Sequence, residues 1–165
     1  MTTTYIPGVN ATSTSFRLGA GELEVILGAP NRTSVNGAQL VWALDAATAE
    51  GVGHAVGSER FTGWATYDIS VMVANASTGT GDHVMRYTAA DRASGESLAA
   101  ATDQADVTTT AGSQNIIQTV ALASGLAAPA AGEMLGFRVA RVSNVAGDTL
   151  PNDLYLYAVI FKKAS

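Results

Sequence analysis

The sequence predicts an all-β protein, an antiparallel β-sandwich with an extended N-terminal arm. Short runs rich in β-branched and aromatic residues recur along the chain and are separated by Gly, Pro, Asn and Asp. Residues 66–74 alternate strictly, with Tyr67, Ile69, Val71 and Val73 on one face, and such alternation indicates a half-buried strand. No segment carries a sustained helical period. Roughly seven or eight strands are expected, a number typical of sandwiches that include the jelly roll.

The length of 165 residues fits one domain, divided here into an arm of residues 1–20 and a sandwich of residues 21–165. Pro7 and Gly8 exclude a helix in the arm. Its apolar residues Tyr5, Ile6 and Phe16 are expected to pin it on another surface, because a solvated tail gains nothing from them.

The first half of the predicted sandwich is rich in turn signals. Strands are expected at residues 22–27 and 39–45, with a tight turn at Asn36-Gly37 between them. One helical turn is expected at residues 46–50, and Gly51 and Gly53 are interpreted as tight-turn residues. Residues 66–74 and 83–89 are expected to pair as a β-hairpin around a polar loop at 75–82.

The second half is predicted to hold three further strands. These are residues 115–122, 133–145 and 154–162, and on the middle one Phe137 and Arg138 fall on opposite faces. Residues 97–106 are compatible with a short helix or with a loop that crosses one end of the sandwich.

The last strand is apolar on both faces, whereas an antiparallel strand in an isolated sandwich has one polar face. Tyr155, Tyr157 and Phe161 are therefore predicted to pack in the core or against other copies of the chain. The alternative is that the two tyrosines, being amphipathic, tolerate partial exposure.

Composition narrows the classes of partner. The net charge of −5 argues against nucleic acid and anionic membranes, and residues 1–5 show no signal-peptide pattern, so a soluble protein made in the cytoplasm is expected. Cysteine is absent, which excludes disulfides and thiolate chemistry. Charged residues make up only 14 %, against about 25 % in an ordinary domain. A surface so poor in charge is compatible with an oligomer.

No catalytic, cofactor or metal site is predicted. His54 and His83 lack the spacing of metal ligands or of a nucleophile triad. Asp148, Asn152 and Asp153 offer oxygen atoms to a cation, but an Asx-type turn is the preferred interpretation. Enzymatic activity is not expected.

One family resemblance comes from the C-terminal third. Residues 133–142 (EMLGFRVARV), the turn at 147–153 (GDTLPND) and residues 154–161 (LYLYAVIF) resemble the last two strands of jelly-roll domains in tailed-phage virion proteins. The resemblance implies a homotrimeric structural protein located in the virion. With so short an arm, it implies a capsid decoration (cement) protein bound to the major capsid protein, with a head fibre as a variant.

The resemblance leaves a second function open, a tail-fibre or baseplate tip that binds a receptor or a glycan. In that function Trp42 and Trp64 are the expected glycan contacts, because exposed indole rings stack on sugars. Exposure of these two rings therefore distinguishes the two functions.

Overall fold

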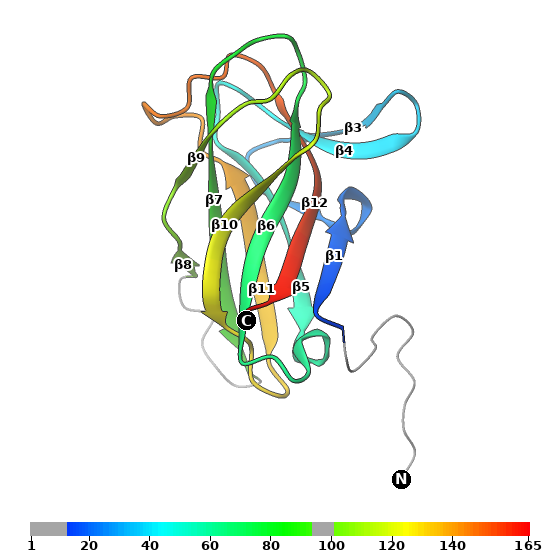
Figure 1. Cartoon of the computed structure of the whole chain (residues 1–165), viewed down its shortest axis with the longest axis vertical. Coiled ribbons are helices and arrows are strands. Elements are labelled where there is room, and N and C mark those ends of the chain that lie inside the picture. The colour runs from blue at the N-terminus through cyan, green and yellow to red at the C-terminus, as the bar shows by residue number, and fades with distance from the viewer. Residues whose placement is uncertain (1–12, 94–100) are drawn as a thin grey trace.

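Two antiparallel sheets pack face to face in the computed structural model, which describes residues 13–93 and 101–165 (Figure 1). The first, named the β6–β12 sheet, has the order β10 (Gln118–Ala127), β6 (Thr66–Asn75), β12 (Leu154–Lys163), β4 (Gln39–Leu44) and β3 (Asn31–Val35), and β1 (Ser15–Gly19) also pairs with β12. The second, named the β5–β11 sheet, has the order β2 (Glu24–Leu27), β5 (Glu50–Gly57), β11 (Met134–Arg141), β7 (Asp82–Arg92) and β8 (Thr102–Asp103), and β9 (Val107–Thr110) also pairs with β7. The predicted β-sandwich is confirmed.

Short 3-10 turns, η1 (Ala20–Glu22) and η2 (Ser58–Phe61), complete the elements of the described residues. None of the helical segments in residues 13–93 and 101–165 is long and apolar enough to cross a bilayer. The core lies between the two sheets and receives the inward face of β6 that the alternation predicts, with Val71 and Val73 fully buried. Across the core, the hydroxyl groups of Tyr67 and Tyr87 lie 2.9 Å apart and join the two sheets by a hydrogen bond.

In the final strand, β12, a bulge brings apolar residues of both parities into the core. Its pairing with β6 shifts register between Leu156 and Ala158. A bulge inserts one extra residue, so the residues that face the core change parity along the strand. Leu156 before the bulge and Phe161 after it are both fully buried, while Tyr155 and Tyr157 point outward and are half-buried. Phe161 thus lies in the core, and the tyrosines lie on the outer face of the β6–β12 sheet.

The predicted hairpin between residues 66–74 and 83–89 is wrong. Both segments are strands, but β6 pairs with β10 and β12, whereas β7 pairs with β8, β9 and β11. The connection at residues 76–81 therefore crosses from one sheet to the other. Local alternation identifies a strand but carries no information about its partner, which burial of the two inward faces decides.

The glycine-rich segment after residue 46 is also different from the prediction. Residues 46–48 form bends, and Gly51 and Gly53 lie inside strand β5. A Cβ atom on Gly53 would collide with the carbonyl oxygen of Phe137 on the neighbouring strand. Glycine is required here by this close approach of two backbones, which a sequence cannot reveal.

The predicted boundary of the arm at residue 20 requires correction too. Ser15–Gly19 is strand β1 of the sandwich, paired in register with β12, so Phe16 lies opposite Phe161. The two rings stack with centroids 4.8 Å apart, and Phe61 packs edge-on against Phe16 at 5.3 Å. Phe16 is thus part of the aromatic core and not a free docking residue. Tyr5 and Ile6 lie outside the described residues.

The segment predicted as a short helix or a loop, residues 97–106, is not helical where the structure describes it, and it contains a short strand. Thr102–Asp103 pairs with β7 as strand β8, and Val107–Thr110 follows as β9. Residues 97–100 of the prediction lie outside the described residues. Charged groups on β7 hold this part of the chain in place, as described below.

Candidate functional site

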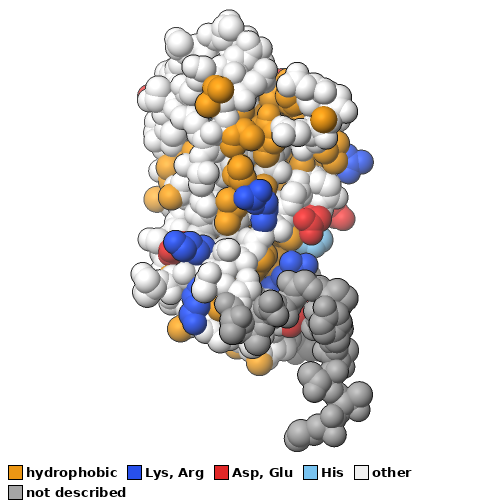
Figure 2. All heavy atoms as spheres, turned by 45° about the vertical axis from the view of Figure 1, so that its right-hand side comes forward, with side chains coloured by type: hydrophobic (Ala, Val, Ile, Leu, Met, Phe, Trp, Pro, Cys, Tyr) orange, Lys and Arg blue, Asp and Glu red, His pale blue; other side chains and the backbone are white. Residues whose placement is uncertain are grey.

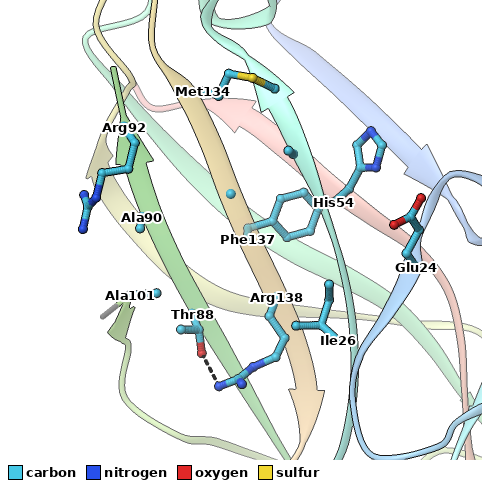
Figure 3. A pocket seen from close by; sticks show the side chains of 12 residues that line it. Glu24, Ile26, His54, Thr88, Ala90, Arg92, Ala101, Met134, Phe137 and Arg138 are labelled. Carbon is cyan, nitrogen blue, oxygen red and sulfur yellow. Dashed lines mark hydrogen bonds between the residues drawn. The ribbon is translucent and has the colours of Figure 1, made fainter. Parts of the chain in front are cut away.

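A groove of about 690 Å³ crosses the outer face of the β5–β11 sheet (Figure 3). The register of β5, β11 and β7 places side chains in rows across the strands. The middle row is Ala55, Gly136 and Ala90, all small, and it forms the floor. The rows on either side carry the walls, which are Met134 with Arg92 on one side and Arg138 with Thr88 on the other.

Gly136 keeps the floor of the groove low. A Cβ atom built on it would approach only the carbonyl oxygen of Ala90, at 3.7 Å, so a larger side chain would fit sterically and would project into the groove. Gly136 therefore differs from Gly53, which close backbone contact requires. The depth of the groove depends on small residues that the fold itself does not demand at this position.

A charged network fixes one wall of the groove. Arg138 Nη2 donates to the hydroxyl of Thr88 at 3.0 Å and lies 3.5 Å from Asp103, and Thr88 donates to Asp103 at 2.6 Å. Arg86 binds Asp106 through two hydrogen bonds of 2.6 and 2.9 Å and also contacts Asp103 at 3.2 Å. The hydrogen bond from Thr88, and then the charges of Arg86 and Arg138, hold the pKa of the Asp103 carboxyl below its ordinary value.

The far side of the groove is formed by strand β2 and the edge of β5. Glu24 and Ile26 come from β2, and the exposed His54 comes from β5 (Figure 3). Glu24 is the one carboxylate that lines the groove among the described residues. Phe137 is the one Phe, Tyr or Trp among the described residues of the lining, and it is only 5 % exposed, so the imidazole of His54 is the one exposed ring among them.

The two tryptophans predicted to contact a glycan do not lie in this groove. Trp42 and Trp64 are 7 % and 9 % exposed and belong to the core. Their indole N–H groups donate to backbone carbonyls, that of Ala20 for Trp42 and that of Ser13 for Trp64. Neither ring has a face on which a sugar could stack, so the sequence-based assignment of these two residues is wrong.

His83 and the predicted turn at residues 147–153 lie around a buried ion pair and form no candidate site. His83 is fully buried on β7, beside an ion pair between Arg141 and Asp148 that is also buried. Because its charge is balanced by Arg141, Asp148 is not available to a cation, and the three-oxygen site considered at Asp148, Asn152 and Asp153 does not form. Within the described ranges, no cluster of three or more His, Asp or Glu side chains is arranged to hold a metal ion.

Sequence reasoning missed the groove because its floor and its far side include residues of β5, a segment interpreted as turns. One signal was present: alternation in residues 133–145 placed Arg138 on the face opposite Phe137, and the structure confirms that arrangement. The small residues that accompany Arg138 on neighbouring strands come together only through sheet register.

Two solved structures are similar to the whole fold. The CBM22-2 xylan-binding domain of Paenibacillus barcinonensis Xyn10C has a TM-score of 0.58 at 17 % identity, and the match covers 90 % of this chain and 99 % of that one. The CBM36-1 domain of a multidomain xylanase from the hindgut metagenome of Trinervitermes trinervoides has a TM-score of 0.53 at 10 % identity, covering 92 % and 98 %. No protein-family model and no curated protein matches the sequence.

At these identities the likeness shows the fold alone. The resemblance to virion jelly rolls is thus supported in its fold, while the capsid decoration role, the virion location and the homotrimer stay predictions from the sequence. The chain is a jelly-roll β-sandwich of the kind found in carbohydrate-binding modules.

Proposed function

We propose that this protein binds a polysaccharide, without cleaving it, in the groove on the outer face of the β5–β11 sheet. The observation that carries the proposal is the arrangement of rows, a floor of Ala55, Gly136 and Ala90 between two walls with hydrogen-bonding side chains. Ligand sites are concave and combine apolar surface with a few polar groups, and this groove has both. The fold that it shares with a xylan-binding domain supports the same proposal.

Binding without hydrolysis is favoured by the charges along the groove. Hydrolysis of a glycosidic bond ordinarily needs two carboxyl groups on either side of the bond. In the described part of the chain, Glu24 alone supplies a carboxylate to the lining. Asp103, the nearest carboxylate of the charged network, is engaged by Thr88 and two arginines.

Filling the groove tests the proposal directly. Gly136→Val places a β-branched side chain on the floor, where the backbone has room for it, and should abolish retardation in affinity gels that contain the bound polysaccharide. The matched control is Ala121→Val, which places the same valine side chain at an exposed position of β10 on the opposite sheet. If Gly136→Val binds every polysaccharide as the parent protein does, the groove is not the binding site.

A second candidate function, self-association, has one observation in its favour. Tyr155, Tyr157 and Ile160 form a half-buried apolar strip on the outer face of β12, and Figure 2 shows hydrophobic side chains gathered along one side of the molecule with few charges among them. The sequence-based prediction of a homotrimer would use such a strip. Sedimentation of the full chain tests it: a trimer that becomes a monomer in Tyr157→Lys supports this function, and a monomer at all concentrations refutes it.

A further inference from the structure

The described residues of the groove include cationic groups on both walls and no exposed Trp, Tyr or Phe ring to stack on a sugar. Arg138 lies opposite Thr88 of β7, four residues before Arg92 on that strand. The two arginines are thus about 13 Å apart along the strand direction, and the small residues of the floor lie between them. Binding of neutral sugars commonly relies on stacking against aromatic faces. Among the described residues of this groove, charge-assisted hydrogen bonds from arginine are the stronger means of recognition.

Arg138 is the less neutralised arginine of the charged network. Its contact with Asp103, at 3.5 Å, is longer than those that Asp103 makes with Thr88 and Arg86, at 2.6 and 3.2 Å. Arg86 is in turn paired with Asp106 through two hydrogen bonds. Asp103 therefore offsets the charge of Arg138 only in part, because charge-charge energy falls with distance and Asp103 is shared.

The guanidinium of Arg138 also has donors to spare. Its two hydrogen bonds both come from Nη2, so Nη1 donates none among the described residues. The two N–H groups of Nη1 are therefore left to donate to a ligand. A planar carboxylate is the partner that matches the fork of a guanidinium with two parallel hydrogen bonds.

Charge complementarity extends to the lining as a whole. The described residues that line the groove include two arginines and one carboxylate, Glu24, on a protein whose net charge is −5. A polyanion is repelled by the net charge of the protein, and these arginines offer it a local attraction. Binding of a polyanionic polysaccharide at the groove therefore depends on the position of the arginines and not on the total charge of the protein.

We propose that the polysaccharide bound in this groove carries uronic acid residues, whose carboxylates are held by Arg138 and Arg92 while the sugar rings lie on the Gly136 floor. This inference rests on the proposed function and specifies its ligand. Because the two arginines stand on opposite walls, neighbouring carboxylates along one chain can be engaged from both sides. Acidic chains should thus bind more tightly than neutral chains of the same length.

The test compares polygalacturonate with its fully methyl-esterified form and with unsubstituted xylan, using affinity gels and titration calorimetry on the full chain. We expect polygalacturonate to bind at least tenfold more tightly than the ester, with an affinity that falls as salt rises. Arg138→Gln and Arg92→Gln should each weaken it about tenfold. Arg17→Gln, an exposed position of β1 in the other sheet, is the control and should bind as the parent does.

Three results would overturn the inference. They are equal affinity for polygalacturonate and its ester, unchanged affinity in both arginine variants, and equally tight binding of dextran sulfate, which would mean that the groove recognises charge and not a carboxylate. If xylan and the ester bind well and Gly136→Val abolishes this binding, the proposed function stands while the uronate assignment fails. If no polysaccharide binds, the proposed function fails with it.

Discussion

Arg141 and Asp148 form an ion pair inside the protein, with Nη2 of the arginine 2.7 Å from Oδ1 of the carboxylate and side chains that are 0 % and 1 % exposed. The guanidinium makes four further hydrogen bonds, to the other oxygen of Asp148 and to the carbonyl groups of Leu44, Leu150 and Asn152. All five of its N–H donors thus have a partner. The pair fastens the connection between β11 and β12 to the end of the sandwich.

Loss of this arginine should be among the most destabilising single changes. Arg141→Met removes the counter-charge of the buried Asp148 carboxylate, which keeps the backbone N–H of Val84 as a donor, and takes the guanidinium away from three backbone carbonyls. Breaking a buried ion pair in this way costs about 3–5 kcal/mol of stability. Urea unfolding at neutral pH measures the loss. Arg32→Met, which removes an exposed arginine of β3, is the control and should change the unfolding free energy by less than about 1 kcal/mol. Equal losses in the two variants would contradict the role given to Arg141.

The hydrogen bond between Tyr67 and Tyr87 should show coupling in a double-mutant cycle. Each hydroxyl is buried and has the other as its partner. Tyr67→Phe or Tyr87→Phe alone therefore leaves one buried hydroxyl without a partner and should lower the free energy of unfolding by about 1–3 kcal/mol. The double variant leaves no hydroxyl unpaired, so its loss of stability should be smaller than the sum of the losses in the two single variants. Additive losses, measured by chemical unfolding, would show that the hydroxyl pair contributes nothing of its own.

Burial of His83 should make stability depend on pH. Burial, and next the positive charge of Arg141, lower the pKa of this histidine from 6.5 to about 4, against the opposing charges of Asp148 and Asp82. Because the folded pKa is the lower one, the unfolded chain binds the proton first as the pH falls. Stability is therefore complete above about pH 6.5 and declines toward pH 4, by about 3 kcal/mol in total.

Replacement of the histidine tests this pH dependence. The unfolding free energy of His83→Leu should fall less between pH 6.5 and 5 than that of the parent protein. His54→Leu, which removes the exposed histidine at the groove, is the control and should keep the parent's slope. A parallel decline in all three proteins would assign the effect to other groups, such as surface carboxylates.

Two glycines on neighbouring strands should respond oppositely to the same substitution. Gly53→Ala forces a methyl group against the carbonyl oxygen of Phe137 and should lower stability by about 1–3 kcal/mol or more. Gly136→Ala meets nothing closer than 3.7 Å and should be neutral or stabilising by up to about 1 kcal/mol, because alanine reduces the entropy of the unfolded chain. Thermal unfolding compares the two, and similar losses would contradict the described backbone approach.

The sequence by itself determined the fold class and the position of most strands. Alternation at Tyr67, Ile69, Val71 and Val73 is a local property, because successive side chains of a strand point to opposite faces whatever the strand pairs with. The same reasoning placed Arg138 on the outer face of β11, where it is found. Both predictions needed only the two-residue alternation of side chains along a single strand.

Tertiary structure decided everything that depends on which strands meet. It separated β6 and β7 into different sheets, used Gly51 and Gly53 inside β5, and buried Trp42 and Trp64 with their N–H groups bound to backbone carbonyls. It also brought Arg92 and Arg138 to the two walls of one groove. Register between distant segments is set by the joint burial of apolar faces, a sum over the whole chain that no local pattern contains.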